Sequence, residues 1–510
     1  MRKDNLSGTD FQLLIDRAVG NDLDYEAFTK ETLKTDLVIV GAGASGLPAA
    51  VEALQKGKRV IVLEHNGAVG GSAVMCFGIL GVNSPLQKKL GVSLTKAQII
   101  KEEQKIFDYR IDGAWLNQML SASGENIAWL EELGVRFSGE VNTYMTDGQF
   151  RSYHPFGGSF GNGVAFVRPL KEKIEKLEGQ ILLRTAARKL IKNEAGKVIG
   201  LYAQRLDNEQ FLRIDCHAVI LACGGYENCD ELLSARGYDP KHMVFRGAKG
   251  HDGSGIYMAL DAGGANYLEK SSLNESPTNM NLKYHNGEYL DLWIGLKGRQ
   301  VIVNGRGERF FDETASREVR GYGVVALRTQ RDLGVYEIYD QDVLDAAIAH
   351  VKRSSPGRYD RAKVMIQESV EEGCPTVWRA DSAEDLAEKT GIPKEQLVRT
   401  LTDYNRYCRQ HEDEDFGKNP EDMWELHAPY YCMKYTDIQY IHSNGAIHTG
   451  RDSQVLTEKH EEIPGLYAVG TLGAEFWQGY YSMNIPGGCM AFNVDSGRRA
   501  VRHAIEHCFD

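Results

Sequence analysis

The segment TDLVIVGAGASG, residues 35–46, decides the fold class of this 510-residue chain. Its first half is a short apolar run rich in β-branched residues, as found in strands buried on both faces of a parallel sheet. Its second half is a glycine turn of the form Gly-x-Gly-x-x-Gly, and a helical stretch follows to about Lys56. A second apolar run, residues 59–63, ends at Glu64. Strand, glycine turn, helix and strand together predict a βαβ unit of the Rossmann type.

The glycine turn and Glu64 indicate a dinucleotide site. Gly41 permits the tight turn, Gly43 lets backbone N–H groups reach a diphosphate, and Gly46 lets the helix pack closely on the strand. The N-terminus of the helix adds partial positive charge. Glu64 follows Gly41 at close to the spacing of about 20 residues at which a carboxylate reaches the ribose hydroxyls.

Three further segments favour FAD over NAD as the dinucleotide. Gly70-Gly71-Ser72 forms a second glycine turn shortly after the second strand. Residues 218–225 are an apolar strand that ends in two glycines, and residues 465–470 repeat this pattern near the C-terminus. A nicotinamide domain would not need contacts spread over the whole chain, whereas an extended FAD does.

Composition excludes several classes of protein. The chain has 59 basic and 71 acidic residues, and the net charge of −12 disfavours nucleic acid or an anionic membrane as a partner. No apolar run is long enough to cross a bilayer, and the polar N-terminus has no signal-peptide core. The nine cysteines are scattered without any Cys-x-x-Cys pair, which predicts reduced thiols, a cytoplasmic location and no metal site.

Changes of composition along the chain predict its organisation. We expect an α/β protein: a Rossmann-like FAD-binding domain of the glutathione-reductase type, built from two separated stretches, with an inserted α+β capping domain. The expected parts are an N-terminal helical extension (1–34), the first FAD-binding part (35–270), the capping or substrate domain (271–426) and the second FAD-binding part (427–510). Helices are expected in the cap at residues 343–352, 362–372 and 394–409.

The chain resembles the flavoprotein family of soluble fumarate reductases and 3-ketosteroid dehydrogenases. The resemblance is carried by the βαβ unit and by these segments: Gly70-Gly-Ser72, Ala222-Cys-Gly-Gly225, residues 251–255 and 262–265, Asn304-Gly-Arg-Gly-Glu-Arg-Phe310, and residues 464–470. It implies a substrate held between flavin and cap. Covalent members of the family attach FAD through a His just after the second glycine turn. Here Ser72 occupies that region, so noncovalent FAD is expected.

Cofactor-binding residues are expected at the glycine turns and strand ends. They are Gly41, Gly43, Ala44, Ser45, Gly46, Glu64, His65, Gly71, Ser72, Ala187, Ala222, Gly224, Gly225, Gly470, Gly487 and Gly488.

The C-terminal segment separates the two branches of the family. Where fumarate reductases grip two carboxylates, this chain lacks most of the expected cations: it has Ser276-Pro-Thr278 and Asn484-Ile-Pro-Gly-Gly488. A dianion without charge-assisted bonds would lose several kcal/mol. Instead, Gly479-Tyr480-Tyr481-Ser482 is similar to the Gly-Tyr-x-Ser signature of 3-oxosteroid 4-dehydrogenases.

That similarity implies oxidation or reduction of a C–C bond next to a ketone, in a 3-oxosteroid or similar cyclic enone. Tyr480 would exchange the proton, supported by Ser482. The amides of Gly487 and Gly488 would polarise the ketone oxygen, beside Tyr481. The second tyrosine that this branch carries in the cap is missing, because the corresponding segment is Glu313-Thr-Ala-Ser316.

Other interpretations remain open. His442, Arg317, Glu313 and Arg320 are further candidates for catalysis or substrate binding, although Glu313 and Arg317 at i,i+4 spacing could form only a salt bridge. One alternative is a reductase of an unsaturated carboxylic acid that uses Arg317 or Arg320. Another is an electron-relay flavoprotein without a substrate pocket. No second nucleotide fingerprint identifies the external electron donor or acceptor.

Overall fold

The computed structural model describes residues 8–143, 150–157, 162–284, 287–315, 326, 329–330, 334–473, 477–479, 481–482 and 484–509. Tyr480, Arg317 and Arg320, three of the predicted site residues, lie outside the described residues.

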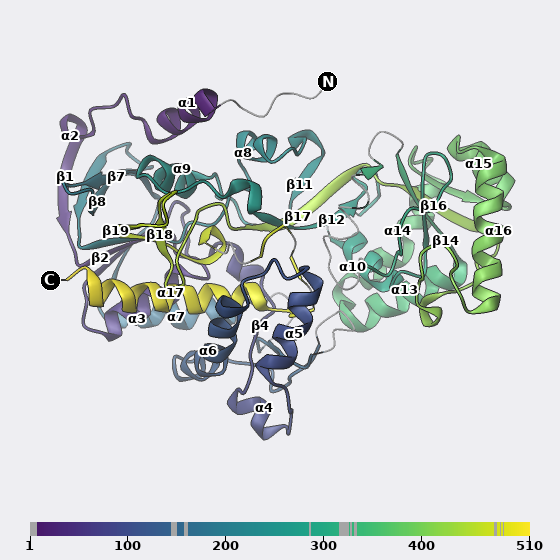
Figure 1. The fold of residues 1–510 in the computed structure, drawn as a ribbon, viewed down its shortest axis with the longest axis horizontal. Helices are drawn as coiled ribbons and strands as arrows, with labels where there is room; N and C mark the ends of the chain where they lie inside the picture. Colours follow the sequence, from purple (N-terminus) through teal and green to yellow (C-terminus); the bar gives the residue numbers. More distant parts are fainter. Residues whose placement is uncertain are drawn as a thin grey trace.

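A six-stranded sheet forms the centre of the first domain (Figure 1). Its order is β18 (Gln454–Leu456), β19 (Glu462–Ala468), β10 (Ala218–Leu221), β2 (Leu37–Val40), β3 (Val60–Leu63) and β6 (Gln180–Leu182). All neighbouring pairs are parallel except β18–β19. Every residue of β2, β3 and β10 is buried, as the sequence predicted for a sheet covered on both faces.

Alternate residues of these strands face two different cores. Leu37 and Ile39 pack in one apolar cluster and Val38 and Val40 in another. Helices cover the first face: α3 (Gly46–Gln55), α7 (Val164–Lys176), α6 (Gly113–Glu132) and α17 (Gly488–His507). A four-stranded sheet covers the second face, in the order β1 (Thr29–Lys34), β9 (Phe211–Asp215), β8 (Val198–Arg205), β7 (Thr185–Lys192). The first domain is therefore a helix–sheet–sheet sandwich.

The N-terminal extension differs from the helical segment that the sequence suggested. Helices α1 (Gly8–Val19) and α2 (Tyr25–Phe28) are present, but residues 29–34 form strand β1, which pairs in parallel with β9. Most residues of β1 are exposed because it lies at a sheet edge, so its sequence lacks the apolar alternation that would reveal it. Helix α1 packs on α9 (Ser254–Asp261).

The middle of the chain forms a second sheet with its own core (Figure 1). The order is β13 (Val301–Asn304), β14 (Val335–Asp340), β16 (Tyr430–Lys434), β15 (Val377–Ala380). The surrounding helices are α10 (Glu288–Leu296), α13 (Gln341–Ser354), α14 (Tyr359–Glu371), α15 (Ala383–Thr390) and α16 (Lys394–Gln410). Strand β16 lies beyond residue 426, so this sheet extends past the expected boundary. An apolar strand here resembles the strands of the first domain, and composition alone did not distinguish them.

A three-stranded ribbon connects the two parts: β11 (Met243–Phe245), β17 (Asp437–Asn444) and β12 (Ser272–Thr278). Between β3 and α7 the chain forms a small hairpin, β4 (Gly78–Leu80) with β5 (Tyr153–Pro155), and the helices α4 (Pro85–Lys89) and α5 (Lys96–Ile106). Helix α8 (Asp230–Ala235) follows β10.

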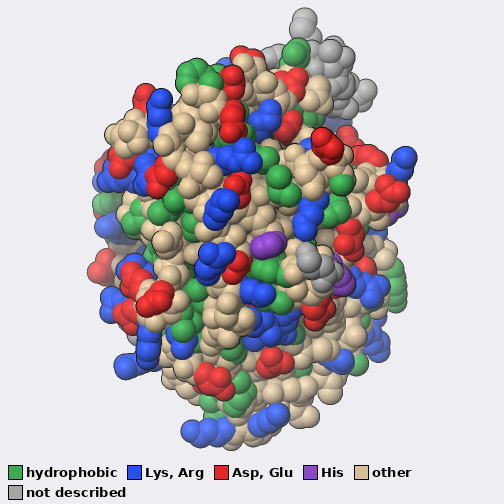
Figure 2. Space-filling model, turned by 90° about the vertical axis from the view of Figure 1, so that its left-hand side faces the viewer, with side chains coloured by type: hydrophobic (Ala, Val, Ile, Leu, Met, Phe, Trp, Pro, Cys, Tyr) green, Lys and Arg blue, Asp and Glu red, His purple; other side chains and the backbone are tan. Residues whose placement is uncertain are grey.

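The surface shows charges of both signs. Figure 2 shows acidic and basic side chains interspersed over the end of the molecule that carries β1. Among the residues placed by the structure, no helix is both long and apolar enough to span a bilayer. All nine cysteines are free thiols.

Candidate active site

The first glycine turn follows β2 and leads into α3. Gly41 has φ +106°, and a Cβ there would lie 2.5 Å from the carbonyl oxygen of Ala222. A Cβ on Gly46 would lie 1.9 Å from the carbonyl oxygen of Gly41, so helix and turn touch at this point. At Gly43 the nearest atom to a Cβ would be 3.9 Å away, and this position therefore opens onto free space. Of the three glycines in this turn, Gly43 is the one that leaves room for a ligand to approach the backbone.

Glu64, at the end of β3, is buried and braces this turn. Its Oε2 accepts a hydrogen bond from the amide of Ala42 at 2.9 Å, and its Oε1 accepts one from the amide of Asn66 at 2.8 Å. The carboxylate also lines the cavity described next. It therefore fixes the turn and remains in reach of a bound ligand.

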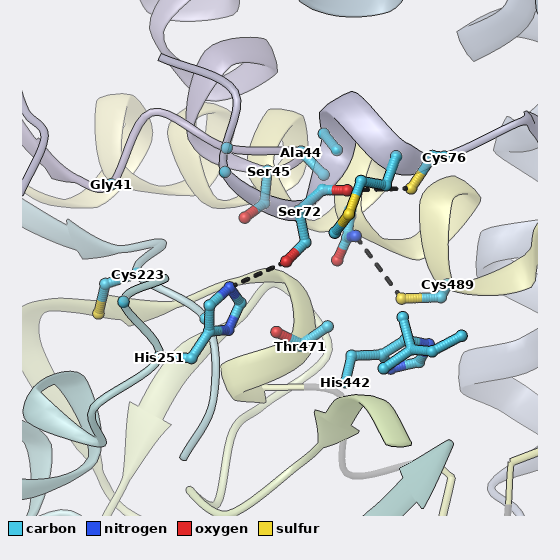
Figure 3. A pocket seen from close by; sticks show the side chains of 18 of the residues that line it. Gly41, Ala44, Ser45, Ser72, Cys76, Cys223, His251, His442, Thr471 and Cys489 are labelled. Carbon is cyan, nitrogen blue, oxygen red and sulfur yellow. Dashed lines mark hydrogen bonds between the residues drawn. The ribbon is translucent and has the colours of Figure 1, made fainter. Parts of the chain in front are cut away.

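A cavity of about 560 Å³ runs from the glycine turn toward the cap (Figure 3). Most predicted cofactor residues line it: Gly41, Gly43, Ala44, Ser45, Glu64, His65, Gly71, Ser72, Ala187, Ala222, Gly224 and Gly487. Segments from both ends of the chain thus meet around one space.

The remaining predicted glycines lie behind the cavity wall. A Cβ on Gly225 would lie 1.8 Å from Ser443 Oγ, and the amide of Gly470 donates to Ser496 Oγ at 2.9 Å. Gly46 and Gly488 are also absent from the lining. The amide of Gly488 donates to the carbonyl of Ile485 at 3.0 Å, so it is already engaged. The expected polarisation of a ketone by the amide of Gly488 is therefore not supported. Gly487 remains the one glycine of this pair that is expected to polarise the ketone oxygen.

The cavity fits an extended dinucleotide. Gly43, Ala44 and Ser45, at the N-terminus of α3, line the open space, where a diphosphate would be stabilised. Asn493 on α17 lines the same cavity, and its buried Oδ1 has no hydrogen-bond partner among the described residues. A buried acceptor without a partner is costly, and a ligand that donates there would remove the cost. The turn, α3, β3 and α17 would therefore hold FAD together.

At the cap end, His442 on β17 lies between two other lining residues. Asn274 Nδ2 on β12 is 3.1 Å from His442 Nε2, and the Tyr481 ring stands edge-on to the imidazole at 4.8 Å between centroids. All three residues line the cavity. A hydrogen bond donated by Asn274 leaves Nε2 unprotonated and places the proton on Nδ1.

Two arginines line this end of the cavity and were not predicted from the sequence. Arg246 follows β11, and its Nε donates to Gln439 Oε1 at 3.3 Å. Arg358 precedes α14, and its Nη1 lies 3.0 Å from Asp291 Oδ2. Burial lowers the pKa of Arg246. The only sequence signal for Arg246 is a cation directly after a short apolar run.

Ser482, predicted to assist proton transfer, is buried and does not line the cavity. Its Oγ donates to Glu103 Oε1 on α5 at 3.0 Å, and Asn484 Nδ2 donates to the same oxygen at 3.3 Å. The other oxygen, Oε2, has no hydrogen-bond partner in the described part of the chain. Burial raises the pKa of Glu103 to about 7, against the opposing effect of these two hydrogen bonds. Glu103 was not predicted because it lies in an ordinary charged helix, far away in sequence.

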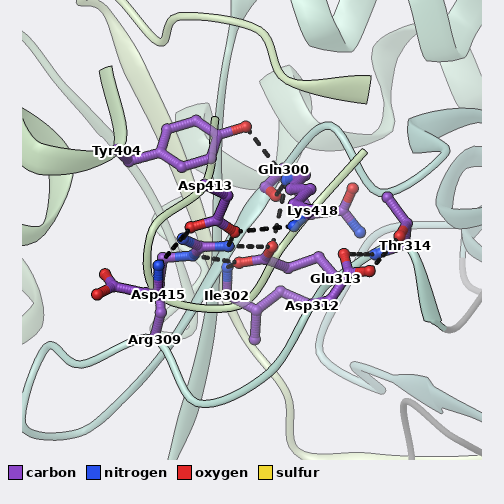
Figure 4. A network of polar contacts seen from close by, with 10 residues as sticks. All are labelled: Gln300, Ile302, Arg309, Asp312, Glu313, Thr314, Tyr404, Asp413, Asp415 and Lys418. Carbon is purple, nitrogen blue, oxygen red and sulfur yellow. Dashed lines mark hydrogen bonds and ion pairs between the residues drawn. The ribbon is translucent and has the colours of Figure 1, made fainter. Parts of the chain in front are cut away.

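Glu313, a predicted substrate-binding residue, belongs to a buried ion cluster in the cap (Figure 4). Its carboxylate contacts Arg309 at 2.9 Å and Lys418 at 3.2 Å, and Arg309 also contacts Asp413 at 2.9 Å. Glu313 does not line the cavity. These contacts give Glu313 a structural role. Its expected partner Arg317 lies outside the described residues.

Comparisons with known proteins agree with this geometry. A family model described as "FAD binding domain" matches residues 36–484. The chain is 29% identical to the vinyl phenol reductase of Lactiplantibacillus plantarum, over 92% of this chain and 96% of that protein. It is 28% identical to the urocanate reductase of Eggerthella lenta, over 86% of this chain and 70% of that protein.

Among solved structures, one similar fold is 3-ketosteroid Δ4-(5α)-dehydrogenase from Rhodococcus jostii RHA1 in complex with 4-androstene-3,17-dione. The TM-score is 0.74 at 21% identity, covering 94% of this chain and 98% of that one. At this identity the likeness shows the fold. Together the matches confirm the flavoprotein resemblance and the FAD cofactor.

Proposed function

Because this chain belongs to the FAD binding domain family, we propose that it is an FAD-dependent oxidoreductase that acts on a C–C bond next to a ketone. The substrate class is a 3-oxosteroid or similar cyclic enone, which the enzyme desaturates or reduces. Bound FAD supplies or accepts the hydride, and the chain supplies the proton and holds the carbonyl oxygen.

The observation that carries the proposal is the mixed character of the cap end of the cavity. Leu290 and Ile294 on α10 and Phe77 before β4 form apolar walls, which suit a ring system. His442 and Asn274 add neutral hydrogen-bonding groups on the opposite strands, β17 and β12. Arg246 and Arg358 also line this end, but Arg358 is paired with Asp291. The apolar walls, the uncharged hydrogen-bonding groups and this pairing together favour a neutral ketone over a dianion, which would need charge-assisted bonds to both carboxylates.

Tyr480 is the proposed proton donor. Tyr481 lines the cavity and Ser482 is anchored to Glu103, so the chain directly after Tyr480 is held by the described structure. Gly487, the residue before α17, has φ +77° and lines the cavity, where the N-terminus of a long helix stabilises negative charge on a carbonyl oxygen.

The test is anaerobic reoxidation of the reduced holoenzyme by a 3-oxo-4-ene steroid, followed by flavin absorbance. We expect rapid reoxidation by wild type and a loss of at least about 10²-fold in Tyr480→Phe, because a general acid contributes 10²–10⁴. Tyr202→Phe is the matched control, because Tyr202 bonds to Glu26 on the surface and lies outside the cavity. Enone turnover that is equal in Tyr480→Phe and wild type would contradict the assignment.

A second candidate substrate is an unsaturated carboxylic acid, as in the urocanate reductase relative. One observation favours it: Arg246 lines the cap end of the cavity and burial lowers its pKa, so an anionic ligand would stabilise its charge. Arg246 thereby replaces Arg317 and Arg320 as the described candidate for carboxylate binding.

The same reoxidation assay separates the two substrate classes. If an enoate is the substrate, Arg246→Gln raises its KM by at least about tenfold, since a charge-assisted bond contributes about 1.5–3 kcal/mol. Turnover of the steroid would then be negligible in every variant. If the enone is the substrate, Arg246→Gln leaves enone turnover within a few fold of wild type.

We also propose a cellular compartment for the protein. Nine free thiols favour a reducing compartment such as the cytoplasm.

A further inference from the structure

Three side chains form a polar relay in the cofactor cavity: Ser72, His251 and Glu227 (Figure 3 shows Ser72 and His251). Ser72 Oγ is 3.2 Å from His251 Nε2, and His251 Nδ1 is 3.1 Å from Glu227 Oε2. Ser72 comes from the second glycine turn, His251 from the loop before α9, and Glu227 from the loop after β10. Ser72 and His251 both line the cavity. The relay therefore reaches from a buried carboxylate to the space that holds FAD.

The contacts of Glu227, the residue of the relay farthest from the cavity, favour its ionised form. Glu227 is fully buried, and its Oε1 accepts hydrogen bonds from the amide of Ser443 at 2.5 Å and from Ser443 Oγ at 3.2 Å. Burial raises the pKa of this carboxyl group, but the facing His251 and the Ser443 bonds outweigh burial and lower it. The Glu227 carboxylate faces His251 Nδ1 and therefore favours a proton on that nitrogen.

His251 faces acidic groups from three segments. Burial lowers the pKa of the imidazole, and the Glu227 carboxylate outweighs it, with smaller contributions in the same direction from Asp252 and Glu64. The ring of Phe245 packs beside the imidazole at 5.6 Å between centroids. The net effect raises the pKa of His251 above its ordinary value, which favours the protonated imidazole.

Protonation of His251 reverses the polarity of Ser72. Ser72 Oγ already accepts a hydrogen bond from the amide of Ala248 at 3.1 Å. When His251 is protonated, Nε2–H donates a second bond to Ser72 Oγ, and the hydroxyl proton is left to point into the cavity. When His251 is neutral, Nε2 is an acceptor, the Ser72 hydroxyl donates to it, and a lone pair faces the cavity instead.

We propose that the Ser72–His251–Glu227 relay raises the reduction potential of bound FAD and couples its two-electron reduction to the uptake of one proton by His251. Reduction makes the cofactor more negative, which favours a donor over a lone pair at the cavity wall. The reductant gives two electrons to FAD, FAD takes its own proton, and His251 takes one more proton from solvent. This inference requires FAD but does not depend on which substrate the enzyme uses.

The test is potentiometric titration of the FAD holoprotein with dithionite and indicator dyes across a range of pH. For a two-electron couple a tenfold change in equilibrium corresponds to 29.6 mV. The difference is expected between the pH at which His251 titrates in the oxidised protein and the higher pH at which it titrates in the reduced protein. In that range the potential of wild type should fall 29.6 mV per pH unit more steeply than that of His251→Asn, which corresponds to one proton. His242→Asn is the matched control, because His242 is exposed and pairs with Asp437 outside the cavity.

Ser72→Ala tests the relay separately from the charge. It keeps the His251–Glu227 pair and removes the hydroxyl. We expect the equilibrium between oxidised and reduced FAD to shift at least tenfold toward the oxidised form relative to wild type, which lowers the reduction potential by at least 29.6 mV. Oxidised FAD affinity, measured by fluorescence titration, shows whether each variant still holds the cofactor.

Two results would overturn the proposal. One is a potential-versus-pH line for His251→Asn that is as steep as that of wild type. The other is a Ser72→Ala protein whose potential equals that of wild type at every pH, and this result counts even if His251→Asn cannot be purified.

Discussion

Replacement of Glu103 by Gln is expected to stabilise the protein at alkaline pH and to change it little in acid. Glu103 is completely buried between α5 and the segment before α17, and its contacts there are neutral donors, Ser482 and Asn484. Gln has the same shape and keeps an acceptor oxygen for both donors, but it cannot ionise. The variant therefore removes the cost of a buried charge and little else.

The magnitude follows from the pKa. Burial raises the pKa of Glu103 from 4.5 to about 7, and a difference of one pKa unit is 1.36 kcal/mol. The folded state binds more protons than the unfolded state between these values, so stability falls as pH rises through this window. Below the unfolded pKa the penalty is absent, and above the folded pKa it is complete at about 3 kcal/mol.

The assay is denaturant unfolding of wild type and Glu103→Gln at about pH 5 and about pH 8, with equal FAD. From the lower to the higher pH, the free energy of unfolding of wild type should fall by about 2–3 kcal/mol more than that of the variant. Glu102→Gln is the control, because Glu102 is its neighbour on α5 and pairs with Lys105 in partly exposed surroundings. A stability difference between wild type and Glu103→Gln that is the same at both pH values would refute the reasoning.

Two further predictions concern the cap cluster and the glycine turn. Glu313→Gln leaves buried Arg309 and Lys418 without enough negative charge, and it should lower the free energy of unfolding by about 3–5 kcal/mol in a denaturant titration. The control is Glu372→Gln, because Glu372 is an exposed partner of Lys283, and it should lower that free energy by at most about 1 kcal/mol. Equal losses in the two variants would contradict the role of the cluster. Gly43→Ala should leave the melting temperature of the apoprotein unchanged but weaken FAD binding at least about tenfold in a fluorescence titration, because only the ligand would meet the new Cβ. An unchanged FAD affinity in that variant would show that the turn does not approach the cofactor.

Much of the fold was accessible from the sequence because its strongest signals are local. The apolar strands at residues 37–40 and 60–63 flank the glycine turn, where a Cβ added to Gly46 or Gly41 would lie 1.9 or 2.5 Å from a backbone oxygen. Such signals need no information about distant residues. Strand β1 was missed and the cap strand β16 was assigned to the second FAD-binding part for the opposite reason, since each is defined by distant partners such as β9 or β14.

The site shows the same limit more sharply. Glu103 and Glu227 look alike in the sequence, each an acidic residue in a polar stretch, and burial raises the pKa of both. Glu103 meets Ser482, 379 positions away, which is neutral and cannot offset burial, so its pKa stays high at about 7. Glu227 meets His251, whose charge outweighs burial and lowers the pKa. Burial thus favours the protonated form of Glu103, whereas His251 favours the ionised form of Glu227. The difference arises from the residue that the fold places beside each carboxyl group. A sequence pattern identifies which groups can ionise; only the packed neighbours determine which of them do so at a given pH.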